Sequence, residues 1–284
     1  MGDDGFPVLR LRQGQSIDDA LRLGRQAGFT RLDAQLLLGH ALGLSRTALL
    51  AHCERALTAN EAESAQALFE RRQEGVPVAY LVGQREFHGL TLRVDRHVLD
   101  PRPDTETLVD WALECASSSV GTLIDLGTGS GAIALAFKAR RAQWSVHASD
   151  ASPQALAVAR ANAQALALEI EFHAGSWWSA AQGRRFALAV SNPPYIAEDD
   201  PHLQSLRHEP RMALVAQEHG LADLQAIIVG AHGGLEPGGW LLLEHGCDQA
   251  QAVGQMLARA DFRDIPHRKD IAGHTRCTGG RLAG

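Results

Sequence analysis

The sequence predicts an α/β protein with a doubly wound, mostly parallel, seven-stranded sheet of the Rossmann-like type. Two observations carry this prediction: apolar strand segments alternate with helical segments from residue 122 onward, and a glycine-rich turn follows the first of these strands. Such alternation places parallel strands side by side, with helices covering both faces of the sheet. Ligands bind beyond the carboxyl ends of such strands, so residues that directly follow strands are the first candidates for a functional site.

The N-terminal part of the chain predicts a small helical bundle. Ser16 is a candidate N-cap for a first amphipathic helix, and residues 31–42 and 59–72 show the spacing of two further helices. Residues 76–99 alternate apolar residues with polar residues and glycine, which predicts a β-hairpin linker. The expected domains are a helical domain at 1–74, the hairpin linker at 75–100 and the α/β domain at 101–284.

The remaining elements follow in order along the α/β domain. A helix is expected from Asp104 to the serine-rich break at 117–119. The expected strands are 122–126, 145–149, 169–173, 187–191, 239–245, 262–268 and 274–282. The expected helices between them are 131–141, 153–166, 221–232 and 248–260.

A rigid polar loop ends the strand expected at residues 187–191. It consists of Asn192, Pro193, Pro194 and Tyr195. The two prolines fix φ and carry no N–H group, so their carbonyl groups only accept hydrogen bonds, and Asn192 adds a side-chain acceptor. This combination suits a planar NH2 group as ligand. A simple strand-ending turn is the alternative, because Asn-Pro starts many turns.

A glycine-rich loop follows the strand that begins the alternation. It consists of Gly127, Thr128, Gly129, Ser130 and Gly131 and leads into an alanine-rich helix. Glycines allow positive φ and close approach of the backbone to a ligand, and the helix start offers unpaired N–H groups. The spacing is G-x-G-x-G, which differs from the G-x-G-x-x-G of dinucleotide sites, and the lysine of a P-loop is missing.

Asp150 ends the next expected strand, at about the 20-residue offset where a carboxylate commonly binds ribose hydroxyls. The alternative is an N-cap role for the helix that begins near Ser152 and Pro153. Together, the glycine loop and Asp150 favour a nucleoside ligand that lacks a pyrophosphate.

In this order and spacing, the glycine loop, Asp150 and the segment 192–195 resemble class I S-adenosylmethionine-dependent methyltransferases that act on amino groups. Two upstream segments narrow the resemblance: PVAYLVGQREF at residues 77–87 and LDPRPDTE at residues 99–106. Over nearly the whole chain the sequence is similar to the HemK/PrmC family. That family methylates the side-chain amide of the glutamine in the Gly-Gly-Gln motif of peptide chain release factors.

The resemblance implies a cofactor, a substrate and a set of site residues. The cofactor is S-adenosylmethionine, and the protein substrate is a release factor docked by the helical domain. Asn192, Pro193 and Tyr195 are implied as catalytic residues, and Asn192, Pro193, Pro194 and Tyr195 as the substrate-binding loop. The implied cofactor-binding residues are Gly127, Thr128, Gly129, Ser130, Gly131, Asp150, Trp177 and Asn192.

Trp177 is expected to stack on the adenine of the cofactor, and packing into the core is the alternative. Its neighbour Trp178 is expected to be such a core anchor. Position 176 is serine, where the family often has an acidic residue before the tryptophan. Arg102, Asp104, Thr105 and Glu106 match the family's linker motif, and an ordinary helix start explains them nearly as well. They stay outside the expected catalytic set.

Two other enzymatic functions and one non-enzymatic function remain as alternatives. An exocyclic amine of a nucleic-acid base, including adenine N6, would fit the same loop, with Tyr195 stacked on the base. A ribosomal-protein glutamine is the second alternative. A nucleoside-binding regulatory module is the third, although a pure binding module has little need for the segment 192–195.

The composition limits which partners, metal sites and cellular compartment we expect. The net charge is −6, with 27 basic residues spread among 33 acidic ones, so we expect no stable nucleic-acid complex. The four cysteines and 13 histidines show no metal-ligand spacing, so we expect no metal site and reduced thiols in a cytoplasmic protein. An apolar signal segment and a long apolar run are both missing, so we expect no membrane association.

Overall fold

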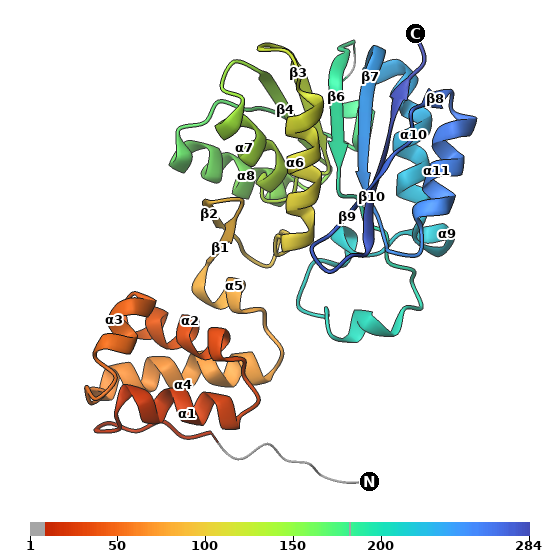
Figure 1. Cartoon of the computed structure of the whole chain (residues 1–284). Helices are drawn as coiled ribbons and strands as arrows, with labels where there is room; N and C mark the ends of the chain where they lie inside the picture. The colour runs from red at the N-terminus through yellow and green to blue at the C-terminus, as the bar shows by residue number, and fades with distance from the viewer. Residues whose placement is uncertain (1–8, 182) are drawn as a thin grey trace. The chain divides into compact units, whose positions relative to one another are not determined.

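The computed structural model describes residues 9–181 and 183–284. The chain divides between Gly83 and Gln84 into two compact units, which are described separately. This division falls inside the segment 75–100 that the sequence presents as a linker. The helices and strands are labelled in Figure 1.

The first unit is a helical bundle. Its helices are α1 (Ile17–Gln26), α2 (Arg31–Leu42), α3 (Arg46–Ala51), α4 (Ala59–Gln73) and α5 (Val78–Val82). The expected N-cap Ser16 is present, because its side chain accepts from the Asp19 N–H and Asp19 caps Ser16 in return. Buried apolar side chains from several helices, including Leu37 and Phe69, form the core of this unit.

One expected strand segment is helical. Residues 78–82 have the alternation of a strand but form α5, which ends at Gly83 in the left-handed region with φ 72°. Pro77 at its start and Gly83 at its end favour a short helix here. The hairpin begins only after it, with β1 (Gln84–Phe87) paired antiparallel to β2 (Leu90–Arg93).

The second unit continues with a doubly wound α/β arrangement. Its strands are β3 (Thr122–Leu126), β4 (Ser145–Asp150), β5 (Glu171–Ala174), β6 (Phe186–Ser191), β7 (Leu235–Glu244), β8 (Phe262–Arg263), β9 (His267–Lys269) and β10 (Thr275–Leu282). Its α-helices are α6 (Glu106–Cys115), α7 (Ala132–Arg140), α8 (Pro153–Leu166), α9 (Gln217–Gly220), α10 (Ala222–Gly234) and α11 (Ala250–Arg259). Short 3-10 helices are η1 (Pro103–Thr105), η2 (Trp177–Ala181), η3 (Pro201–Gln204) and η4 (Arg211–Ala213).

The sheet confirms the predicted fold class. Its strand order is β5-β4-β3-β6-β7-β10-β8, with β9 also paired to β10. The strands from β5 to β7 are parallel, and β10 is antiparallel to its neighbours. Eight strands replace the expected seven, because the expected strand 262–268 consists of two short strands, β8 and β9, that pair with different parts of β10.

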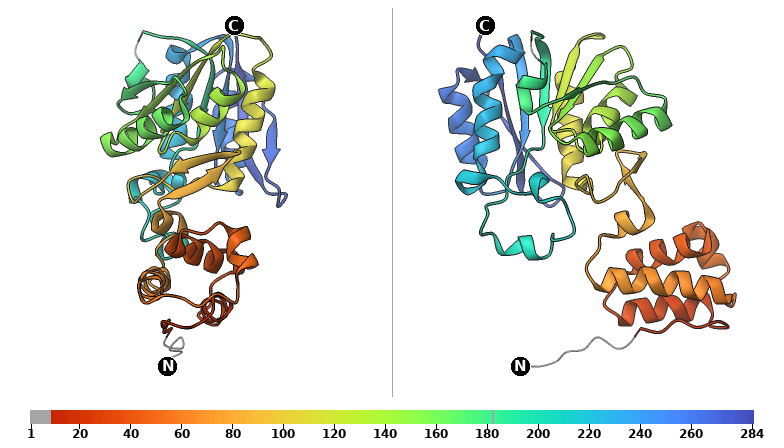
Figure 2. Two further views of the ribbon diagram at one scale, coloured as in Figure 1. Left: turned by 90° about the vertical axis from the view of Figure 1, so that its left-hand side faces the viewer. Right: turned by 180° about the vertical axis from the view of Figure 1, so that it is seen from behind.

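Helices cover both faces of this sheet (Figures 1 and 2). One buried cluster joins Leu123 of β3 and Leu242 of β7 to α6 and α7, while a second joins Ile124 and Leu241 to α10 and α11. Neighbouring residues of one strand thus enter opposite clusters, as the side-chain period of a strand requires. Among the described residues, no helix has the length and apolar character needed to cross a bilayer.

Candidate active site

A cavity of about 260 Å³ lies beyond the carboxyl ends of β3, β4 and β6. The chain runs from β3 to β4 and β5 on one side and then returns to β6 on the other side of β3. This reversal is the switch point at which doubly wound sheets bind ligands. Of the predicted site residues, the cavity wall contains Gly127, Thr128, Gly129, Ser130, Asp150, Trp177, Asn192 and Pro194.

A second cavity, of about 340 Å³, shares residues with the first. Pro193 and Tyr195 line this second cavity, and Asn192 lines both. Gly131 is outside both sets of lining residues. It instead starts α7 at φ 84°, where an added Cβ would lie 3.0 Å from Leu135 Cδ1. The structure therefore brings the other predicted residues together around two adjoining cavities, while Gly131 is the N-cap of α7.

The glycine loop is held by two carboxylates. The Gly129 N–H donates to Asp150 Oδ2 at 2.9 Å, and Thr128 Oγ1 donates to Asp125 Oδ2 at 2.6 Å. Gly127 and Gly129 both have positive φ, of 77° and 55°, which favours glycine. These contacts fix a backbone turn that side chains at 127 and 129 would strain.

Asp125 is a site residue that the sequence analysis did not single out. It is fully buried at the end of β3 and also accepts from the Ala134 N–H at 3.3 Å. Burial raises the pKa of Asp125 to about 7, against the lowering effect of its hydrogen bond from Thr128. The available signal was a lone carboxylate inside an otherwise apolar strand, two residues before the first glycine.

Asp150 occupies the position at the end of β4 that the glycine loop faces. Its second oxygen, Oδ1, accepts from the Ser152 N–H at 2.8 Å. The N-cap of α8 is Ser152, whose Oγ accepts from the Ala155 N–H at 3.1 Å. The alternative of Asp150 as N-cap is therefore wrong, and its carboxylate lines the cavity. Burial raises the pKa of Asp150.

The two adjacent tryptophans have different surroundings. Trp177 lines the cavity, and an added Cβ on Gly127 would lie 3.0 Å from its ring. The side chain of Trp177 also hydrogen-bonds Asp223, another residue of the cavity wall. Trp178 instead donates from Nε1 to the Ile227 carbonyl of α10 at 2.7 Å, and it packs on that helix as expected of a core anchor.

A chain of hydrogen bonds holds both ends of the segment 192–195. Asn192 Nδ2 donates to Thr105 Oγ1 at 3.1 Å, which leaves the Asn192 amide oxygen as the group that accepts. Thr105 and Tyr195 both hydrogen-bond the carboxyl group of Glu244, the Tyr195 hydroxyl at 3.3 Å from Oε1. The carboxyl group of Glu244 therefore orients the Asn192 amide through Thr105 and the Tyr195 ring directly.

Glu244 is buried, with 1% of its surface exposed, at the carboxyl end of β7. Burial raises the pKa of Glu244 to about 7. Burial also raises the pKa of the Tyr195 hydroxyl, and the nearby carboxyl group of Glu244 adds to that increase. The sequence analysis missed Glu244 and left Thr105 outside the catalytic set. The signal for Glu244 was its place at the end of an apolar strand, at the same sheet edge as Asp150 and Asn192.

Charged residues close the outer wall of the two cavities. Arg102 lines both cavities and forms an ion pair with Glu209, whose Oε2 accepts from the Asp100 N–H at 3.3 Å. Arg85 contacts Asp100 from the hairpin at 3.5 Å. These contacts connect the segment 99–106 to the loop that follows residue 195.

Two family profiles match the chain. One, described as the PrmC N-terminal domain, matches residues 19–83, and the other, the methyltransferase small domain, matches residues 105–220. Among solved structures, the ribosomal protein L11 methylase from Lactobacillus delbrueckii subsp. bulgaricus has a TM-score of 0.51 at 23% identity. That match covers 68% of this chain and 86% of the other, and it shows the shared fold.

Relatives in sequence extend over most of the chain. The release factor glutamine methyltransferase of Vibrio cholerae is 47% identical over 254 residues, covering 88% of this chain and 89% of that protein. The release factor glutamine methyltransferase of Escherichia coli is 45% identical over 254 residues, covering 88% and 92%. Identity and coverage of this extent, with both domains matched, show that the chain belongs to the release factor glutamine methyltransferase family.

Proposed function

We propose that this protein transfers a methyl group from S-adenosylmethionine to the side-chain amide nitrogen, N5, of the glutamine in the Gly-Gly-Gln motif of peptide chain release factors. The S–CH3 bond breaks as the N–CH3 bond forms, which leaves S-adenosylhomocysteine and N5-methylglutamine, and the amide gives up one proton to solvent. The relatives' names, the cavity pair and the acceptor-rich segment 192–195 support this proposal.

The first cavity suits S-adenosylmethionine. When bound, this cofactor supplies a methyl carbon made electrophilic by a positively charged sulfur. The backbone of the glycine loop would hold the amino-acid portion, the Asp150 carboxylate would accept from the ribose hydroxyls, and Trp177 would stack on the adenine. Ser176 lines the same cavity.

The second cavity suits the glutamine amide. Asn192 Oδ1 and the Pro193 carbonyl accept the two N–H bonds of the substrate amide and orient its nitrogen toward the first cavity. Because both acceptors carry negative partial charge, they also favour the positive charge that develops on nitrogen during transfer. The Tyr195 ring lies against the amide plane and adds a cation–π contribution as that charge develops.

Positioning is the larger energetic contribution in this mechanism. The lone pair of an amide nitrogen is delocalised into its carbonyl group, so the nitrogen is a weak nucleophile. Correct placement of two reactants supplies about 7–11 kcal/mol, whereas a positioned acid or base typically supplies about 10²–10⁴-fold in rate. A fixed pair of acceptors therefore suffices, and the mechanism assigns no residue as a dedicated general base.

The observation that carries the proposal is the place of Asn192 in the walls of both cavities. A methyl group that passes from one bound molecule to another needs such a shared boundary. The hydrogen bond from Asn192 Nδ2 to Thr105 also leaves the amide oxygen as the acceptor that the substrate NH2 group requires.

Parallel assays with labelled S-adenosylmethionine test this function. The purified protein is incubated separately with release factor, ribosomal proteins, tRNA and DNA, and the labelled product is analysed by mass spectrometry. We expect label only in the release factor, on the glutamine of the Gly-Gly-Gln motif. Label confined to nucleic acid or to a ribosomal protein would exclude the proposed substrate, and label in none of them would favour a binding module.

A further inference from the structure

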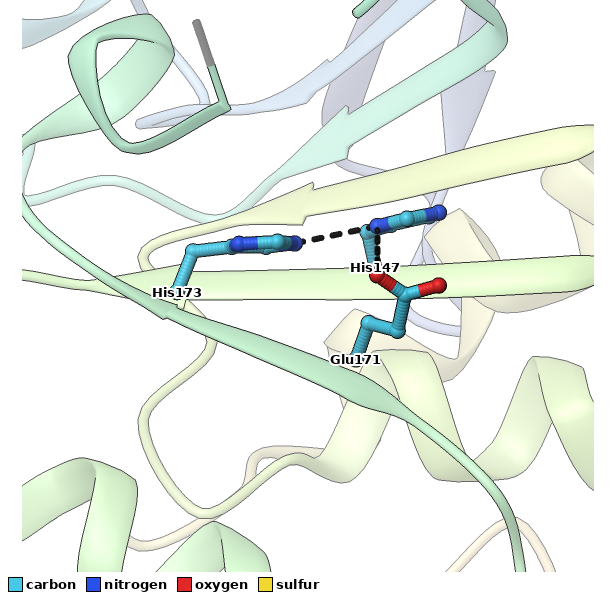
Figure 3. A group of neighbouring side chains, drawn as sticks. All are labelled: His147, Glu171 and His173. Carbon is cyan, nitrogen blue, oxygen red and sulfur yellow. Dashed lines mark hydrogen bonds and ion pairs between the residues drawn. The ribbon is translucent and has the colours of Figure 1, made fainter.

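Two histidines and a glutamate gather at the edge of the main sheet, away from the residues that line the two cavities (Figure 3). His147 lies on β4, and Glu171 and His173 lie on the edge strand β5. His147 is the register partner of Glu171, and His173 follows two residues later, so all three side chains share one face of the sheet. The sequence analysis did not expect this group, because it comes from two strands.

The spacing of the three side chains suits a small cation. One ligand atom from each residue lies within 4.8 Å of the others. His147 Nδ1 is 3.0 Å from His173 Nε2 and 3.6 Å from Glu171 Oε2. Zn–N bonds of about 2.0–2.1 Å place two tetrahedral ligand atoms about 3.3–3.4 Å apart, so side-chain shifts of a few tenths of an ångström and a reorientation of the rings complete the site.

The surroundings of His147 place a lone pair, and no proton, on Nδ1, the nitrogen that would bind the ion. His147 Nε2 is 3.1 Å from Ser145 Oγ, while Arg184 donates from NH1 to His147 Nδ1 at 3.0 Å. A nitrogen that accepts from a guanidinium carries a lone pair, so the proton of the neutral ring is on Nε2 and faces the serine. An outer partner of this kind fixes the tautomer of metal-binding histidines.

Arg184 shows that this position already attracts a positive charge. Its NH1 atom is 2.6 Å from Glu171 Oε2 as well as 3.0 Å from His147 Nδ1. A guanidinium nitrogen thus contacts two of the three ligand atoms. The Arg184 side chain is 48% exposed and can turn into solvent when another cation arrives.

We propose that His147, Glu171 and His173 form a site for a divalent transition-metal ion of the Zn²⁺ class, which displaces the guanidinium of Arg184. Two imidazoles and one carboxylate are the ligand set of many three-residue zinc sites, and imidazole nitrogen favours such ions over Mg²⁺ and Ca²⁺. A solvent molecule completes the tetrahedron, because Glu171 is exposed. The bound ion links the edge strand β5 to β4 and stabilises that side of the sheet.

Equilibrium competition of Zn²⁺ against a chromophoric chelator, with the full-length protein, tests the site. We expect one Zn²⁺ per chain bound by this group, and Co²⁺ in its place should give the visible absorption of a four-coordinate ion. Glu171→Gln and His173→Gln should each weaken Zn²⁺ binding by roughly 100-fold or more. Both substitutions are at incompletely buried positions, so the variants should fold.

Two further variants separate this site from general binding by surface histidines. Arg184→Gln removes the competing cation and should strengthen Zn²⁺ binding by about tenfold, while His202→Gln, at an exposed histidine in η3, should leave it unchanged. Equal Zn²⁺ affinity in wild type and His173→Gln would overturn the proposal, as would loss of binding in Arg184→Gln. Absence of Zn²⁺ binding in the wild type would also overturn it.

Discussion

Asn192 is the residue whose substitution tests the catalytic proposal most directly. Asn192→Ala removes the amide oxygen that we propose orients the substrate nitrogen, and it leaves the backbone of the segment 192–195 in place. We expect kcat to fall by about 10²–10³-fold, the usual cost of removing one preorganised polar contact to the reacting group. Cofactor affinity should change little, because in the proposed mechanism the glycine loop and Asp150 provide most of that binding. Steady-state kinetics and calorimetric titration of the cofactor measure the two quantities.

Thr105 provides the matched control for this prediction. Thr105→Ser keeps the hydroxyl that bonds Asn192 and Glu244, whereas Thr105→Val keeps the shape and removes the hydroxyl. Activity should survive in the serine variant and fall in the valine variant. Equal losses of kcat and cofactor affinity in Asn192→Ala would contradict the role assigned to its oxygen.

Glu244 should make the stability of the protein depend on pH. Its ordinary pKa is 4.5, and burial raises the pKa in the folded state to about 7. Between these values the unfolded chain releases a proton that the folded chain retains, so stability falls as pH rises and levels off above about pH 7. Glu244→Gln removes this titration and should flatten the decrease, as measured by urea unfolding from pH 4.5 to 8.

The control for this experiment is Glu198→Gln, the same change at an exposed position. Its unfolding free energy should follow the wild-type curve at every pH. Asp125 contributes a decrease of the same sign, because burial raises its pKa to about 7 as well, so Glu244→Gln should reduce the slope without abolishing it. An unchanged slope in Glu244→Gln would mean that the buried carboxyl is ionised throughout.

The position of a side chain at the cavity could be predicted from the sequence where a residue directly follows an expected strand. Asp150 and Asn192 were found in this way, and both line the first cavity. Glu244 was missed, because the expected strand 239–245 includes it, whereas β7 ends at this residue. The hydrogen bond between Thr105 and Asn192 joins residues far apart in the sequence, and the sequence pattern carries no information about such a pair.

At the level of elements, the end of α9 limits the position of the segment 192–195. Gly220 has φ 84°, and an added Cβ would lie 2.1 Å from the Tyr195 carbonyl oxygen. That carbonyl accepts from Gln249 Nε2 at 3.0 Å. The added methyl group would therefore clash with a carbonyl that a hydrogen bond already fixes in place. Gly220→Ala should displace Tyr195 and lower kcat by at least about tenfold, equivalent to about 1.4 kcal/mol.

Gly273→Ala separates this clash from backbone strain. Gly273 has φ 88°, close to that of Gly220, and an added Cβ would have no neighbour within 4 Å. This variant should lose stability by about 1–2 kcal/mol, the cost of a left-handed conformation, and keep its activity. A similar loss of activity in both variants would assign the effect to strain alone.

Most elements could be predicted from periodicity, and the failures have a physical reason. Helices α2 and α8 occupy the expected ranges, because their N-caps and their apolar faces agree. The five residues of α5 alternate as a strand would, but Pro77 and Gly83 confine them to one helical turn. Short segments are decided by their ends and by tertiary packing, which outweigh the period of the pattern.

At the level of the whole molecule, the division after Gly83 suggests separate tasks for the two units. We propose that the helical unit docks the release factor, since every predicted cofactor residue belongs to the second unit. Deleting residues 1–83 should then lower kcat/KM for the intact release factor by at least about tenfold, equivalent to about 1.4 kcal/mol. Calorimetric titration should find cofactor affinity unchanged.

A short peptide with the Gly-Gly-Gln sequence is the control substrate. It carries the methylated glutamine and lacks the rest of the release factor, so the full-length and shortened proteins should methylate it at similar rates. Full activity of the shortened protein on the intact release factor would rule out docking by this unit. Loss of cofactor affinity would show that the second unit depends on the first for its own structure.

The overall architecture was the most predictable feature of the molecule. Strand and helix alternation from β3 onward allows few connections other than a doubly wound sheet, and the structure has this topology. The split of one expected strand into β8 and β9 was not predictable, because it depends on how β10 bends between two partners, with a register shift between Thr275 and Cys277. The sequence pattern predicts which segments pair with each other more reliably than it predicts the residue at which each pairing ends.

The shared position of Asn192 makes the two binding events thermodynamically linked. Asn192 lines both cavities, so a ligand that moves its side chain from one cavity changes the affinity of the other cavity for its own ligand. Linkage of this kind is reciprocal: if the methyl donor raises the affinity for the acceptor by some factor, the acceptor raises the affinity for the donor by the same factor. If the added methyl group crowds this boundary after transfer, the two products lower each other's affinity by the same factor.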